Sequence, residues 1–248
     1  MILLNLTTKR VISLKVKLRI IVKEALLLMI SSLRTLTLDS LGVVNRASEL
    51  LNLVKDIKPG ELALGSELCV SGYESLGDNF ENALIANLKK SLSNGAFFGF
   101  THFSDGFNEF ILLNGDKEIY KQKKAILFTP NLEQDKFKAG KVEDINLFEL
   151  EGVKIGVLIC FELRFTELWE KLKGADIILV PSLWGKGRKR HFEILCEALA
   201  LQNRCYVVAC SDKDLKFEAV FKPNGHIAKS SEFEPNSANE FKKSLGLV

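Results

Sequence analysis

The sequence lacks the glycine-rich motifs that bind nucleotide phosphates. It contains no GxGxxG and no GxxxxGK[ST] pattern, which excludes a dinucleotide-binding fingerprint and a P-loop. Its five cysteines form no CxxC pair and have no zinc-like spacing to a histidine, which excludes the common structural zinc sites. The odd number of cysteines, without a disulfide-rich pattern, is typical of the reducing cytoplasm, where we expect the protein to reside.

The sequence also lacks a strong excess of charge of either sign. Its net charge is only +3, and the basic residues cluster only in 9–23 and 186–190. Neither cluster contains the interleaved aromatic residues that stack on bases. We therefore expect no nucleic-acid partner.

The N-terminal 28 residues contain no uninterrupted apolar run of membrane-spanning length. Lysines and arginines divide the apolar residues of 1–28 into short pieces, whereas a helix needs roughly 20 consecutive apolar residues to cross a bilayer. The segment also has no secretory cleavage site. We interpret 1–28 as an N-terminal extension of unclear role and expect no membrane partner. A basic amphipathic surface anchor is the alternative.

The remaining sequence is that of a globular domain. Hydrophobic residues make up 47% and charged residues 26% of the chain, which is usual for a soluble fold with a sizeable core. Period-2 and helical patterns alternate along the chain. We predict a strand within 31–39 that begins after Leu33, further strands at 61–73, 96–105, 107–114, 118–128, 153–160, 176–184 and 206–211, a hairpin within 217–231, and helices at 42–57, 79–94, 165–174 and 191–205.

This order of elements predicts an α/β fold. Strands that alternate with helices, with β-meander pieces between them, are typical of sheets covered by helices on one side. We expect a four-layer α-β-β-α sandwich, in which two mixed sheets pack face to face between outer helices. No shift of composition marks an internal boundary, so residues 29–248 are predicted to form one domain.

Cys160 lies where chemistry is expected in such a fold. It ends the predicted buried strand 153–160, and ligands favour the carboxyl ends of strands. A helix that begins near Phe165 would lower the pKa of its thiol through the helix dipole. A nucleophilic cysteine also needs a base, but no local pattern connects it to any of the three histidines, which are His102, His191 and His226.

A carboxylate and an ammonium group are the remaining candidates for assisting Cys160. Glu67 lies in the apolar stretch ALGSELCVSGY, where a desolvated carboxylate could exchange protons with a sulfur and a leaving amine. Lys124 precedes the apolar run AILF. The residues alone leave open which of Lys121, Lys123 and Lys124 faces inward, because lysines also protect edge strands. Glu67 could equally be a surface charge.

These segments resemble the three signatures of the nitrilase (carbon–nitrogen hydrolase) superfamily. SELCVSGY is similar to its glutamate motif, KKAILF to its lysine motif, and GVLICFELRFTELW to its cysteine motif. ADIILVPSLW and HFEILCEALALQNRCYVVA are similar to the strand, helix and strand that follow the cysteine. The resemblance implies a Glu67–Lys124–Cys160 triad, and it assigns the family's second glutamate to Glu133. It covers about residues 31–230.

The sequence departs from the family pattern at several positions. Ser66 and Thr166 replace prolines, Gln202 replaces a glutamate, and Glu162 replaces the more frequent aspartate. None of these changes removes a member of the implied triad.

The resemblance implies amide hydrolysis through a thioester. Glu67 would act as the general base and Cys160 as the nucleophile. Lys124 and the backbone N–H of Phe161 would hold the oxyanion. This chemistry requires no metal and no organic cofactor. The family also implies a homodimer or larger homo-oligomer.

The predicted substrate is a small ω-amide that carries a carboxylate. Arg164 or a residue of 185–190 would bind that carboxylate, and Glu162 and Trp184 are further candidates for substrate binding. N-carbamoyl amide hydrolysis is an alternative activity. The alternative from another class is a catalytically inactive scaffold of the same fold.

Overall fold

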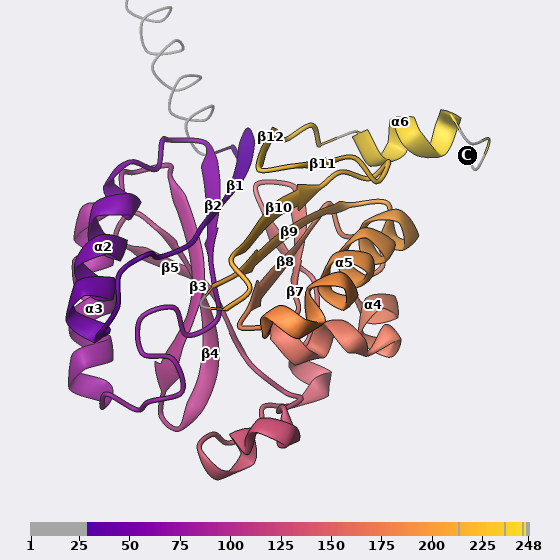
Figure 1. Ribbon diagram of the computed structural model, residues 1–248. Helices are drawn as coiled ribbons and strands as arrows, with labels where there is room; N and C mark the ends of the chain where they lie inside the picture. The colour runs from indigo at the N-terminus through magenta and orange to yellow at the C-terminus, as the bar shows by residue number, and fades with distance from the viewer. Residues whose placement is uncertain (1–28, 213, 236, 245, 247–248) are drawn as a thin grey trace, which may run out of the picture.

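The computed structural model describes residues 29–212, 214–235, 237–244 and 246, so the predicted extension 1–28 lies outside the described residues. Two six-stranded mixed sheets pack face to face, and helices cover their outer sides (Figure 1). The predicted four-layer α-β-β-α architecture is confirmed. Within the described part of the chain, no helix combines the length and the apolar character that a membrane span requires.

The first sheet contains the N-terminal strands and one strand from the C-terminal region. Its order is β12-β1-β2-β3-β4-β5. Strands β1, β2 and β3 are parallel, and the other pairs are antiparallel. Helices α2 and α3 cover its outer face (Figure 1). The bounds are β1 Ser32–Leu36, α2 Val43–Lys55, β2 Glu61–Gly65, α3 Asp78–Ser91, β3 Phe97–Ser104, β4 Phe107–Asn114, β5 Lys117–Lys123 and β12 Ser230–Glu232.

The second sheet has the order β11-β10-β9-β8-β7-β6. Its three central strands β7, β8 and β9 are parallel, and helices α4 and α5 lie on its outer side (Figure 1). The bounds are β6 Phe148–Leu150, β7 Val153–Val157, α4 Thr166–Lys171, β8 Ile177–Ser182, α5 Lys189–Asn203, β9 Tyr206–Ser211, β10 Phe217–Phe221, β11 Ile227–Ala228 and α6 Ser237–Ser244. Short 3₁₀ helices connect the strands: η1 Thr129–Asn131, η2 Glu133–Asp135, η3 Val142–Asp144, η4 Cys160–Arg164 and η5 Lys186–Arg188.

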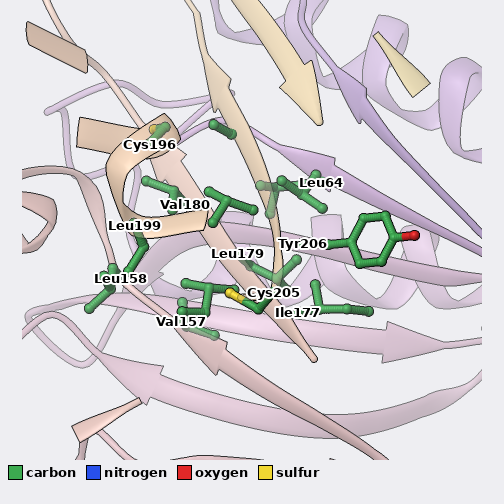
Figure 2. Packing of buried hydrophobic residues seen from close by; sticks show 14 of the residues in the cluster. Leu64, Val157, Leu158, Ile177, Leu179, Val180, Cys196, Leu199, Cys205 and Tyr206 are labelled. Atoms are coloured by element: carbon green, nitrogen blue, oxygen red, sulfur yellow. The ribbon is translucent and has the colours of Figure 1, made fainter. Parts of the chain in front are cut away.

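The alternation of side chains along each strand separates the core into two layers. In β4, Phe110 and Leu112 belong to the core cluster between the sheets, whereas Ile111 and Leu113 belong to the cluster under α2 and α3. Successive side chains of a strand point to opposite faces, so β4 is apolar at every one of these positions. Figure 2 shows part of the inner cluster, to which Leu64 of β2 and Leu179 of β8 both contribute.

The prediction that the first strand begins after Leu33 is wrong. Strand β1 begins at Ser32, and Leu33 is fully buried in the inner cluster. Leu36 is buried in the outer cluster. Because both faces of β1 are covered, apolar residues occur in both phases of the period-2 pattern, and the phase of Leu33 carries no information about where the strand begins.

Glu81 of α3 is a buried acid outside the cavity described below. Glu81 is only 3% exposed, and its Oε1 has no hydrogen-bond partner among the described residues. Burial raises the pKa of Glu81 to about 7, although the Phe103 N–H donates a hydrogen bond that opposes this shift. The folded protein therefore favours the protonated form of this carboxyl group.

We predict that Glu81→Gln stabilises the protein relative to wild type, and that this gain is larger at pH 8 than at pH 5. Because the folded-state pKa lies above the ordinary value, the folded wild type binds more protons than the unfolded chain between about pH 4.5 and 7, and loses stability as the pH rises through this window. Glutamine does not titrate. Urea unfolding should show a relative gain of about 1–2 kcal/mol for the variant at pH 8. The exposed Glu149→Gln serves as control, and a pH-independent difference would contradict the prediction.

Candidate active site

The implied triad residues each follow the end of a strand. Glu67 comes two residues after β2, Lys124 comes directly after β5, and Cys160 comes three residues after β7. The sequence analysis placed all three inside longer strands, so the predicted strand ends are wrong. The structure nevertheless brings the three side chains together between the two sheets. The Nζ of Lys124 lies 2.8 Å from the Oε1 of Glu67.

Lys124 is held between two carboxylates. Besides its contact with Glu67, its Nζ lies 2.9 Å from the Oε1 and 2.8 Å from the Oε2 of Glu133. None of these three side chains has exposed surface. Burial alone would lower the pKa of the Lys124 ammonium group, but the negative charges of Glu67 and Glu133 and a hydrogen bond with Glu133 raise it above its ordinary value. Lys124 is therefore a permanently charged group in a dry site.

Glu133 is fixed by further hydrogen bonds. The hydroxyl of Tyr73 donates to its Oε1 at 2.9 Å, and the backbone N–H of Phe128 donates to its Oε2 at 2.8 Å. Both carboxylate oxygens thus have donors besides Lys124. Tyr73 was missed in the sequence analysis as a member of this network, although it belongs to the quoted SGY signature.

Cys160 begins the 3₁₀ helix η4 with a left-handed backbone, at φ 53°. Such a conformation is unfavourable for a residue with a side chain and persists only where the surroundings impose it. Burial raises the pKa of the Cys160 thiol well above its ordinary value, and a hydrogen bond and repulsion from Glu67 raise it further. The charge of Lys124 and the Leu183 N–H oppose these effects. The resting thiol is therefore protonated, with the Glu67 carboxylate and the Lys124 ammonium as its charged neighbours.

The two oxygens of Glu67 have different environments. Oε1 accepts hydrogen bonds from the Lys124 ammonium and from the Asn108 Nδ2, both at 2.8 Å. Oε2 has no hydrogen-bond partner among the described residues. Asn108 was also missed in the sequence analysis. The sequence does contain a signal for it: Asn108 is a polar residue in the same period-2 phase as the apolar residues Phe110 and Leu112.

The expectation that Glu162 binds substrate disagrees with its position. Its side chain is completely buried and is not among the residues that line the cavity. Its Oε1 accepts a hydrogen bond from the Ala125 N–H at 2.6 Å, and its Oε2 accepts one from the Ile159 N–H at 2.7 Å. Burial raises the pKa of Glu162 to about 7 against the effect of these bonds. Glu162 therefore connects the residue after Lys124 to the residue before Cys160.

A cavity of about 620 Å³ opens above Cys160. Phe161, Arg164 and Trp184, which the sequence analysis named as candidates, all line it. The guanidinium of Arg164 lies 4.5 Å from the centre of the Trp184 ring, and that of Arg188 lies 5.0 Å from the centre of the Phe128 ring. The lining of the cavity thus includes a thiol and two guanidinium groups, each placed over an aromatic ring.

The two arginines of the cavity are close enough to repel each other. Burial and the charge of Arg188 both lower the pKa of Arg164. Within the described part of the chain, neither guanidinium forms an ion pair with a carboxylate. An anionic ligand would relieve this repulsion.

The three histidines do not line the cavity. His102 is buried in β3, with its Nε2 3.7 Å from the Oε2 of Glu109. His191 contacts the Arg164 side chain at 3.5 Å. Carboxylates and an ammonium group, rather than an imidazole, are therefore the titratable groups nearest to Cys160. Among the described residues, no group of three or more His, Cys, Asp and Glu side chains is arranged to hold a metal ion.

Comparison with known proteins identifies the family of this chain. The carbon-nitrogen hydrolase family model matches residues 31–226. The chain belongs to the carbon-nitrogen hydrolase family. Its solved structural relatives include an amidase from Nesterenkonia sp., with a TM-score of 0.70 at 13% identity over 88% of this chain and 96% of that one. A nitrilase-superfamily protein of Saccharomyces cerevisiae gives a TM-score of 0.69 at 20% identity over 88% and 96%.

Curated relatives are more similar in sequence but over shorter stretches. A 2-oxoglutaramate amidase of Bacillus subtilis is 37% identical over 44% of this chain and 42% of its own length. A deaminated glutathione amidase of Escherichia coli is 38% identical over 35% of this chain and 36% of its own length. In both cases the matched stretch spans less than half of the relative.

Proposed function

We propose that the protein hydrolyses the carbon–nitrogen bond of a small carboxylate-bearing amide, with Cys160 as nucleophile. One observation carries the proposal: Lys124 contacts Glu67 and Glu133 at 2.8 Å each, and Cys160, which has Glu67 and Lys124 as charged neighbours, lines the cavity. An acid, an ammonium and a sulfur that are far apart in the chain meet at one buried point. This arrangement is suited to general acid–base and nucleophilic catalysis.

In the first half of the reaction, Glu67 takes the proton of Cys160 and the thiolate attacks the amide carbon. A carbon–sulfur bond forms, and the carbonyl oxygen gains the negative charge. The Lys124 ammonium and the backbone N–H of Phe161 stabilise this oxyanion. The carbon–nitrogen bond then breaks, and Glu67 donates its proton to the leaving nitrogen. The products of this half are a free amine or ammonia and a thioester on Cys160.

In the second half, water replaces the departed amine. Glu67 takes a proton from this water as it attacks the thioester carbon. The carbon–sulfur bond breaks, the carboxylic acid is released, and the sulfur recovers its proton. Glu67 returns that proton to the sulfur, so the same carboxylate acts as base, acid, base and acid in turn, which requires that it stay fixed beside the sulfur throughout.

Arg164 and Arg188 support the assignment of an anionic substrate. Both guanidinium groups line the cavity, and each is held on an aromatic ring. Arginine forms bidentate hydrogen bonds with carboxylates. The names of the relatives, 2-oxoglutaramate amidase and deaminated glutathione amidase, agree with an amide that carries a carboxylate. Trp184 would position Arg164 by stacking.

The other proposals of the sequence analysis remain predictions. N-carbamoyl amide hydrolysis and an inactive scaffold are outcomes that the assays below distinguish. The cytoplasmic location and the homodimer or larger homo-oligomer also remain predictions.

We predict that wild-type protein releases ammonia from succinamate, a monoamide of a dicarboxylic acid, and that Cys160→Ser and Glu67→Gln each reduce kcat by about a thousandfold or more. Both substitutions are nearly isosteric. The exposed Lys121→Ala, on β5 close to Lys124, is the control and should retain activity. If wild type releases no ammonia from a panel of amides, the scaffold reading holds. Release from an N-carbamoyl amide alone would favour the alternative activity.

We predict that Arg164→Gln raises KM for succinamate by about tenfold to a hundredfold, because a charge-assisted hydrogen bond contributes about 1.5–3 kcal/mol. The KM for the neutral amide propionamide should change little. Steady-state kinetics with both amides measure this difference. The exposed Lys171→Gln on α4 is the matched control. Equal effects of Arg164→Gln on the two amides would contradict carboxylate recognition by this residue.

A further inference from the structure

We propose that Asn108 is a positioning residue that selects which oxygen of Glu67 exchanges protons with Cys160. The inference rests on the proposed function, because it concerns the same carboxylate. Asn108 lies in none of the segments that resemble the family signatures. It occupies the second position of β4 and is not among the residues that line the cavity.

The sequence of β4 directs Asn108 toward the site. Side chains alternate along a strand, so Asn108 shares a face with Phe110 and Leu112, which pack in the cluster between the two sheets. It is a fully buried polar residue on this apolar face. A buried amide needs hydrogen-bond partners, and among the described residues its side chain has one at the Glu67 end.

Asn108 contacts two members of the proposed triad through different groups. Its side-chain Nδ2 donates to the Oε1 of Glu67 at 2.8 Å. Its backbone carbonyl accepts a hydrogen bond from the Lys124 N–H at 2.8 Å. The same residue therefore fixes the main chain that carries the ammonium and the carboxylate that pairs with it.

The orientation of the Asn108 amide follows from chemistry. An ionised carboxylate only accepts hydrogen bonds, so the NH₂ group must face Glu67 and the carbonyl oxygen must face away. That oxygen, Oδ1, is buried without a hydrogen-bond partner among the described residues. An unpaired buried acceptor is destabilising, and an apolar residue would avoid it. The hydrogen bond that Asn108 donates to Glu67 offsets the cost of this unpaired oxygen.

The consequence is a division of roles within Glu67. With Lys124 and Asn108 both on Oε1, that oxygen is anchored by two donors. Oε2 has no hydrogen-bond partner among the described residues and is therefore the oxygen left open to receive the Cys160 proton. Asn108 thus supplies one of the two donors that hold Oε1 away from this exchange.

The test is the pH dependence of Cys160 alkylation by iodoacetamide, which needs no knowledge of the substrate. Rates are measured by intact mass between pH 5 and 9 for wild type, Asn108→Ala and Asn108→Asp. Loss of the donor, or its replacement by a second carboxylate, should move the acidic limb of the rate profile to higher pH by about one unit. The control is Asn114→Ala, a buried asparagine at the other end of β4 whose side chain accepts from the Gly95 N–H.

The outcomes separate the inference from the proposed function. Wild type in which Cys160 reacts no faster than the other cysteines would overturn both. Fast wild-type labelling with unshifted profiles in the Asn108 variants would overturn only the inference, because a merely structural residue changes stability without moving the profile. If Asn108→Ala does not fold, the equally large Asn108→Asp carries the test. Failure of both variants to fold would assign Asn108 to folding and overturn its positioning role.

Discussion

The structure depends on one buried ammonium group, that of Lys124, between the carboxylates of Glu67 and Glu133. Charges removed from water are tolerated only when their partners lie at close range with good geometry, and loss of one partner of a buried pair is strongly destabilising. Two carboxylates around one ammonium leave a net negative charge beside the Cys160 thiol. Burial first, and then the charge of Glu67, keep the thiol protonated at rest by raising its pKa, and Glu67 is the carboxylate beside it that can accept its proton.

The fold maintains this arrangement by connecting segments that are distant in sequence. Glu162 connects the backbone after Lys124 to the backbone before Cys160, and Asn108 connects β4 to Glu67 and Lys124. The Glu67 N–H donates to the Ser182 carbonyl at the end of β8, which connects the two sheets at the site. These contacts join buried or half-buried groups, so the geometry is fixed before any ligand enters the cavity.

The sequence predicted the architecture and the members of the site better than the local boundaries. The alternation of strands and helices was sufficient for the four-layer sandwich. Strand ends were placed too late because the apolar runs around Glu67, Lys124 and Cys160 continue past the last ladder hydrogen bond into buried loops. The start of β1 was predicted too late because both faces of this strand are covered, so Leu33 can be apolar and out of phase and still belong to it.

The roles of individual polar residues were harder to predict, because they depend on contacts across the fold. The carboxylate of Glu162, two residues after Cys160, suggested a substrate ligand. Its oxygens instead accept hydrogen bonds from backbone N–H groups that only the folded chain brings together. Asn108 and Tyr73 act through side chains far from them in sequence, Glu67 and Glu133. Arg164 and Trp184 were named as candidates because they lie in or beside segments that resemble the family signatures, and both line the cavity.

The central claim, that Cys160 reacts with the help of Glu67, is tested most directly by stoichiometric alkylation with iodoacetamide at neutral pH, followed by intact mass and peptide mapping. The four other cysteines are also buried, but none of them lines the cavity. We predict rapid modification at Cys160 alone in wild type and its loss in Glu67→Gln. Uniformly slow modification of all five cysteines, or unchanged labelling of Cys160 in Glu67→Gln, would contradict the account.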